Sequence, residues 1–138
     1  MTERWTGGNV EWHDPQIDTS ESVWYSPWHW YVIRPANLTL GRFTDIGAFT
    51  VINAAQGVEI QDNVQIGSHC SLNSVNTIDG IAGKITLMEG CKIGAHTVIM
   101  PGVTVGHNSK VGANSFVKQS IPAQQVWAGS PARFLRYI

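Results

Sequence analysis

The chain has 138 residues, of which 43% are hydrophobic and 14% charged, and its formal net charge is -1. This length suits one domain, and so small a net charge gives no global field that would attract nucleic acid or an anionic membrane. No apolar run is long enough to span a bilayer, and the start, MTERWTGGNV, lacks the apolar core of a signal peptide. We therefore expect a cytoplasmic protein.

Residues 1–37 hold much of the aromatic bulk of the chain, including Trp12, Trp24, Trp28 and Trp30. Prolines interrupt this part, so we expect an extended segment rather than a helix. A coiled β-structure exposes the backbone of its first strands, and such an edge invites aggregation. The sequence therefore predicts an aromatic-rich N-terminal cap over the structure that follows.

From residue 38 onward an aliphatic residue recurs about every six positions, most regularly in KIGAHTVIMPGVTVGHNSKVGA (92–113). The first positions of these hexads are Leu40, Ile46, Ile52, Ile60, Ile66, Leu72, Ile78, Leu87, Ile93, Ile99, Val105, Val111 and Val117. A period of six fits short strands separated by tight corners, with three strands in each coil. The pattern predicts an all-β prism over residues 38–138, ending in a short C-terminal tail.

Every third hexad should lie on the same wall of the prism, and this register predicts which residues stack. With Ile78 counted as a hexad position, one wall stacks Ile52, Leu72, Ile93 and Val111. The same register predicts one inward column of Thr50, Cys70, Cys91 and Ser109, and outward columns of Ser74, Ala95 and Ala113 and of Val75, His96 and Asn114. Small outward side chains would leave backbone amides open to a ligand along the wall. We expect both cysteines to be reduced core residues.

Two stretches, GVEIQDNVQIGSHCSL and the segment from KIGAHTVIM to IPAQQVWAGSPARFLR, resemble the hexapeptide-repeat acyltransferases. That family includes maltose and galactoside O-acetyltransferases and bacterial amino-sugar N-acetyltransferases. The resemblance implies a left-handed parallel β-helix that moves an acetyl group from acetyl-CoA to an amino or hydroxyl group of a sugar, in surface-polysaccharide or nucleotide-sugar synthesis. It also implies a homotrimer with active sites between subunits.

The resemblance assigns the coenzyme-binding residues position by position. It implies that the Ala95 amide faces the thioester carbonyl, where such a donor contributes about 3 kcal/mol to acyl transfer. Ala113, one coil away, would bind the pantetheine arm. Arg133 and Arg136 correspond to the basic tail residues that hold the phosphates of the coenzyme, and Lys118 lies on the same route.

The general base of the sugar O-acetyltransferases is missing here. The resemblance places their aspartate and histidine where this chain has Asn76 and Thr77, in LNSVNT. Three routes stay open: direct attack by an amine, which needs no strong base; a displaced base, either His96 or His69; or Asp79 on the short loop that follows. Asn76 itself resembles the asparagine that some sugar N-acetyltransferases of this fold carry in this region.

Two other functions fit a β-helix of hexads. One is a scaffold or binding module without catalysis, which the missing base keeps open. The other is a carbonic anhydrase of the γ class, which needs three convergent histidines on zinc. His69, His96 and His107 are widely spaced and are predicted on different walls or corners, so we expect no metal.

Overall fold

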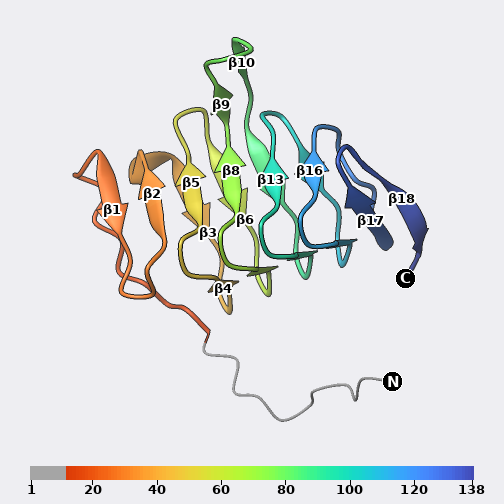
Figure 1. Ribbon diagram of the computed structural model, residues 1–138. Coiled ribbons are helices and arrows are strands. Elements are labelled where there is room, and N and C mark those ends of the chain that lie inside the picture. Colours follow the sequence, from red (N-terminus) through yellow and green to blue (C-terminus); the bar gives the residue numbers. More distant parts are fainter. Residues whose placement is uncertain (1–11) are drawn as a thin grey trace.

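The structure is a computed structural model that describes residues 12–138, and these form a left-handed parallel β-helix with three walls (Figure 1). The first wall contains β3 (Leu38–Leu40), β6 (Val58–Ile60), β11 (Ile85–Leu87) and β14 (Thr104–Val105). The second contains β4 (Asp45–Ile46), β7 (Gln65–Ile66), β12 (Lys92–Ile93), β15 (Lys110–Val111), β17 (Gln125–Gly129) and β18 (Ala132–Tyr137). The third contains β1 (Val23–Tyr25), β2 (Tyr31–Ile33), β5 (Val51–Asn53), β8 (Ser71–Asn73), β13 (Val98–Ile99) and β16 (Phe116–Val117).

Each coil contributes one aliphatic residue from each wall to a continuous core. Of the predicted first positions, twelve point inward or lie at the end of the stack, and the exception is Ile78, which is 92% exposed. The stacks on the three walls are Leu40, Ile60, Leu87 and Val105; Ile46, Ile66, Ile93 and Val111; and Ile52, Leu72, Ile99 and Val117. The hexad pattern thus predicted the fold and the inward residues.

The predicted register was wrong across one interruption. Leu72 pairs with Ile99, not with Ile93, and Ile93 pairs with Ile66 and Val111. The cause is Ile78, which follows Leu72 by one hexad but lies in a hairpin that leaves the coil, formed by β9 (Val75–Asn76) and β10 (Ile81–Ala82). The prediction therefore aligned residues after the hairpin with the wrong residues before it. The error amounts to one wall of the prism.

The register error separates the two cysteines and changes the outward columns. Cys70 follows Thr50 and precedes Thr97, whereas Cys91 precedes Ser109 in a different inward column. Ala95 and Ala113 do share a column, but their neighbour on the preceding coil is Ser68, not Ser74. His96 likewise follows His69, not Val75.

Tight corners bring the backbones of successive coils into contact. A Cβ atom added to Gly67 would lie 2.5 Å from the nitrogen of Ala95, and one added to Gly94 would meet the nitrogen of Ala113. Backbone atoms cannot move aside as a flexible side chain does. Glycine is therefore required at both positions for the coils to stack.

We expect Gly94→Ala to lower the free energy of unfolding by roughly 1–3 kcal/mol, because the new methyl group overpacks a backbone contact. Urea denaturation at matched protein concentration measures the change. Thr39→Ala, on the exposed face of β3, is the control and should change stability by less than about 0.5 kcal/mol. An unfolding midpoint for Gly94→Ala equal to that of the wild type would contradict the close contact.

In the described part of the predicted cap, Trp24, Trp28 and Trp30 pack in or against the core at the first coil, and residues 1–11 of that cap lie outside the described residues. β1 pairs antiparallel with β2, which pairs parallel with β5, so the third wall extends beyond the hexads. Trp30 is fully buried, and its Nε1–H donates to Nδ1 of His13 at 3.3 Å. The His13 ring stacks on Trp28 at 4.1 Å. A 3-10 helix, Pro35–Asn37, leads from this cap into β3.

The C-terminal tail closes the other end of the helix. β17 continues the second wall beside β15, and β18 folds back antiparallel to β17. Trp127 on β17 is 8% exposed and covers the last coil. In the part of the chain described here, no helix is long and apolar enough to cross a bilayer.

Candidate functional site

The corner between the second and third walls, here called the amide corner, carries the small residues Ala48, Ser68, Ala95 and Ala113 on successive coils. The backbone of this corner is tied together by bonds such as Asn114 N–H to the Ala95 carbonyl at 2.8 Å. The N–H groups of Ala95 and Ala113 donate no hydrogen bond within residues 12–138. Ala95 is half-buried and Ala113 is exposed. Ala48 and Ser68 likewise donate none, so open amides line this corner on successive coils, and Ala95 and Ala113 share a column as the spacing predicts.

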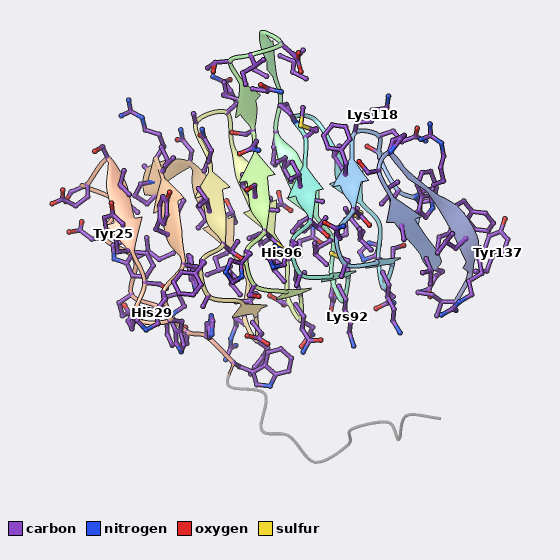
Figure 2. All side chains as sticks on the ribbon, in the orientation of Figure 1. Tyr25, His29, Lys92, His96, Lys118 and Tyr137 are labelled. Carbon is purple, nitrogen blue, oxygen red and sulfur yellow. The ribbon has the colours of Figure 1, made fainter. Side chains whose placement is uncertain are left out.

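The residues that follow Ala48, Ser68 and Ala95 carry rings, and with His29 on the preceding coil they form a ladder, here called the corner ladder: His29, Phe49, His69 and His96. The His69 and His96 rings are parallel within 5° and their centroids are 4.6 Å apart. The ring centroids of Phe49 and His69 are 5.1 Å apart, and those of His29 and Phe49 are 6.5 Å apart. His96, labelled in Figure 2, therefore follows Ala95 in the chain, and the His69 ring of the preceding coil stacks on its ring.

All four ladder residues have positive φ angles between 57° and 68°. Histidine and asparagine tolerate this left-handed conformation better than most residues, whereas a bulky side chain such as Phe49 makes it an outlier. The same conformation occurs at other corners, as at Asn63 and Asn108, so it belongs to the tight turns of the helix in general. Sequence analysis missed the contact between His69 and His96, because 27 residues separate them and only the length of the hairpin reveals that this spacing is one coil.

Asn76 and Asp79 lie on the β9–β10 hairpin, away from the amide corner. The Asn76 side-chain amide donates to Asp79 Oδ2 at 3.0 Å, and its Oδ1 accepts from the Ile78 N–H at 3.0 Å. Both contacts stabilise the tip of the hairpin. A cavity of about 470 Å³ lies between the hairpin and the third wall, where Asn73, Val98 and Phe116 are part of its lining.

The candidate phosphate-binding residues are exposed and lie in two places. Arg133 pairs with Ala128, which contacts Gly112 at the last level of the amide corner. Arg136 pairs with Val126, farther across the second wall. Lys118 follows β16 at the opposite edge of the third wall (Figure 2). Within one chain, the strand that carries Arg133 thus lies beside the amide corner, and Lys118 lies at the other edge of the third wall.

Both thiols are inaccessible. Cys91 is fully buried, and burial raises the pKa of its thiol from 9.0 to about 12. Burial also raises the pKa of Cys70, whose S–H donates to the Gly94 carbonyl at 3.2 Å. Neither cysteine has the exposed thiolate that nucleophilic catalysis needs.

We expect neither cysteine of the native protein to react quickly with a disulfide reagent at pH 8, and both to react after denaturation. The folded state holds the Cys91 proton more tightly than the unfolded state, so this contribution to stability is complete below about pH 9. It is lost as the pH rises toward 12. Thiol titration and denaturation at stepped pH measure both effects. Fast labelling of one thiol in the native protein would contradict the burial.

Metal-binding groups are not apparent: residues 12–138 contain no cluster of three or more histidine, cysteine, aspartate or glutamate side chains that could hold a metal ion. His69 and His96 share a corner, contrary to the prediction that they lie on different walls or corners, and their rings are stacked rather than convergent.

Comparison with known proteins adds to this geometry. Residues 84–119 match the family described as bacterial transferase hexapeptide (six repeats). Galactoside O-acetyltransferase of Escherichia coli K12 is 33% identical over 127 residues, which cover 86% of this chain and 62% of that protein. Part of the chain thus matches the hexapeptide-repeat model, and most of its length is similar to a sugar O-acetyltransferase.

Two further comparisons show the range of proteins to which this chain is similar. Gamma carbonic anhydrase 2 of Arabidopsis thaliana mitochondria is 31% identical over 89% of this chain and 44% of its own length. The hexapeptide-repeat acetyltransferase VCA0836 of Vibrio cholerae has a TM-score of 0.74 at 28% identity, over 82% of this chain and 69% of its own. That protein has also been solved with acetyl coenzyme A. The chain thus spans between two fifths and two thirds of the length of the curated relatives compared here.

Proposed function

We propose that this hexapeptide-repeat protein is an acetyltransferase that moves an acetyl group from acetyl-CoA to an amino or hydroxyl group of a sugar. The observation that carries the proposal is the pair of open amides at Ala95 and Ala113, one coil apart, with the strand that carries Arg133 beside the last level of the same corner. Such a row suits an extended thioester whose phosphates lie at the basic end. The relatives named above that are acetyltransferases support it.

In this arrangement the Ala95 N–H stabilises the negative charge that develops on the thioester oxygen. The acceptor nitrogen or oxygen attacks the carbonyl carbon, and the carbon–sulfur bond breaks. The coenzyme leaves as a thiolate, which takes up a proton. The Ala113 N–H holds the pantetheine arm, and Arg133 and Arg136 hold the phosphates.

His96 is the residue that we propose as the general base. It is next to Ala95 in the chain, its ring is exposed, and His69 supports it from the preceding coil. The imidazole takes the proton that the acceptor loses as it attacks and passes it toward the leaving thiolate. We favour an amino sugar as acceptor, because an amine needs less help from a base than a hydroxyl does.

We further propose a cytoplasmic homotrimer with three sites, each between two subunits. The surroundings of the amide corner support shared sites, because the described part of one chain offers no acceptor pocket that combines the open amides with the polar hairpin residues.

A coupled assay tests the function. Incubation with acetyl-CoA and a panel of amino sugars should release free coenzyme thiol only when an acceptor is present, and mass spectrometry should show an acceptor heavier by one acetyl group. The buried cysteines keep the background low. If calorimetry detects coenzyme binding but no sugar of the panel is acetylated, the protein is a binding module rather than an acetyltransferase. If the coenzyme does not bind at all, the protein is a scaffold.

A further inference from the structure

Residues of the N-terminal cap and of the first coil line a cavity of about 180 Å³, here called the cap cavity. Its lining consists of Trp12, His13, Asp14, Arg42 and Phe43. The first three precede β1 in the chain, and the last two lie at the corner that leads into β4. Sites that enclose a whole drug-sized or cofactor-sized ligand have about 300–1,000 Å³. The cap cavity is therefore suited to a single ring.

Two exposed aromatic rings line the cap cavity. Trp12 is 41% exposed and Phe43 is 49% exposed. In the described part of the chain, neither ring stacks on another aromatic ring. By contrast, Trp24, Trp28 and Trp30 are packed in or against the core. The cap cavity thus contains two apolar faces that the core does not use.

Phe43 lies at a corner where the other coils carry small or polar residues. On the following coils the same position holds Asn63, Gly90, Asn108 and Gln124, and all five residues have positive φ angles. Asparagine and glycine tolerate this conformation, whereas a bulky aromatic residue does not favour it. The turn therefore has no need of the phenyl ring, and its exposure shows that the core has none either.

Two charged groups of opposite sign complete the lining. The guanidinium carbon of Arg42 lies 5.3 Å from the centroid of the Phe43 ring, and Asp14 comes from the facing segment. Both charged side chains are exposed, and neither forms an ion pair among the described residues. A guanidinium only donates hydrogen bonds and a carboxylate only accepts them. A neutral ligand with both donors and acceptors can therefore use the two groups at once.

Buried contacts hold the residue between Trp12 and Asp14 in place. The His13 N–H donates to the Thr44 carbonyl at 2.7 Å. The His13 side chain is 4% exposed, and its Nδ1 accepts from the Trp30 Nε1–H. These bonds tie the cap to the first coil, so both sides of the cap cavity are in position before a ligand binds. Such preorganisation reduces the entropy lost on binding.

We propose that the cap cavity binds one pyranose ring of a glycan. A pyranose has an apolar face of C–H groups, which suits the rings of Trp12 and Phe43. Its rim of hydroxyl groups donates to the Asp14 carboxylate and accepts from the Arg42 guanidinium, and hydrogen bonds to charged groups are the stronger kind. A neutral sugar fits because the two charges of the lining balance each other.

The cap cavity lies away from the amide corner. Phe43 precedes Ala48 by five residues, and Ala48 is two coils before Ala95. Because a strand rises about 3.3 Å per residue and coils lie about 4.8 Å apart, the cap cavity is roughly 15–20 Å from the Ala95 amide. That distance is longer than one sugar ring. The sugar in the cap cavity is therefore not the one that receives the acetyl group.

A groove of about 490 Å³ on the second wall lies between the two places, and its lining includes Asp45 and Gly67. Oδ1 of Asp45 is 3.7 Å from Nε2 of His13, which lines the cap cavity. Gly67 packs against the backbone of Ala95 at the amide corner. A glycan with one ring in the cap cavity can follow this groove, so the acceptor is an oligosaccharide or longer glycan. This last step rests on the proposed function, whereas sugar binding in the cap cavity does not.

A glycan array tests the cap cavity without any assay of transfer. The wild-type protein should bind oligosaccharides on the array, and Trp12→Ala/Phe43→Asn should bind them at least about tenfold more weakly. Asparagine is the replacement at residue 43 because Asn63 holds the same corner position on the next coil, so the fold should be retained. Tyr25→Ala, which removes a 71% exposed ring from β1, is the control and should bind as the wild type does.

Several results would overturn the inference. A wild-type protein that binds no glycan on the array excludes the sugar, and equal binding by Trp12→Ala/Phe43→Asn places the sugar elsewhere. If calorimetry shows that this variant loses coenzyme A but keeps the glycan, the two rings hold the coenzyme. If the variant sediments with a lower mass than the wild type, the rings belong to a contact between copies of the chain.

Acceptor length tests the link between the cap cavity and the amide corner. The amino sugar that the coupled assay identifies is offered alone and within oligosaccharides of increasing length. For the wild type, KM should fall at least about tenfold with length while kcat stays the same. Trp12→Ala/Phe43→Asn should keep the KM for the single sugar and lose the fall. A wild-type KM that is independent of length would contradict the link.

The outcomes for this inference and for the proposed function are distinguishable. Acetyl transfer to single sugars, with neither glycan binding nor an effect of acceptor length, would overturn the inference and leave the function standing. Glycan binding that depends on Trp12 and Phe43, without any acetyl transfer, would do the reverse.

Discussion

His96→Asn should lower kcat by about 10²–10⁴-fold, while the affinity for coenzyme A stays within about twofold. Asparagine is the chosen replacement because residue 96 has a φ of 58°, which asparagine tolerates and alanine does not. The expected loss reflects removal of the proton acceptor beside the thioester. Steady-state kinetics on the amino sugar that the coupled assay identifies, together with calorimetry of coenzyme binding, separates chemistry from binding.

His69→Asn and His107→Asn are the matched controls for this loss. His69 supports the His96 ring from below, so its removal should lower kcat by less than the removal of His96, whereas His107 lies at another corner and should have no effect. If His96→Asn keeps full activity, an amine attacks without a base and the first of the three routes is correct. If only His69→Asn abolishes turnover, His69 is the general base and His96 is the ring that supports it.

Ala113→Tyr should weaken coenzyme A binding by at least 100-fold. The alanine side chain is exposed and small, and its N–H is one of the two open donors of the amide corner. A phenol ring there would fill the path of the pantetheine arm and cover the donor. The free energy of unfolding should stay within about 0.5 kcal/mol of the wild type, because no buried group changes. Calorimetric titration with coenzyme A measures the loss.

Ala36→Tyr provides the control, since Ala36 is an exposed alanine in the 3-10 helix near the cap. It adds the same ring away from the amide corner and should leave binding unchanged. Undiminished affinity in Ala113→Tyr would mean that the coenzyme does not lie along the amide corner, and the assignment of Ala95 would lose its support.

Residue spacing predicted correctly those features of this protein that depend on uninterrupted repeats. Ala95 and Ala113 are 18 residues apart with no insertion between them, so three hexads place them in one column whatever happens earlier in the chain. Inward positions such as Ile93 and Val111 follow for the same reason, because burial of one aliphatic residue per hexad is a local property.

Residue spacing predicted the wrong register across the β9–β10 hairpin. Ile78 follows Leu72 by six residues and is as apolar as any core position, yet it is exposed. Sequence alone does not show whether such a residue turns inward or leaves the coil, since either choice satisfies the same short pattern. Because Ile78 was counted as a core position, each residue after the hairpin was predicted on the wrong wall relative to Leu72 and the residues before it. The contact between His69 and His96 could therefore not be predicted.

What the sequence by itself determined is thus the prism, its inward residues, its aromatic cap and the pairing of Ala95 with Ala113, because each depends on a short, repeated spacing. Only the tertiary structure decided the register across the hairpin, the corner ladder and the separation of Asn76 and Asp79 from His96. These features depend on how many residues leave the coil before the chain rejoins it, and that number is set by packing between coils rather than by any local preference.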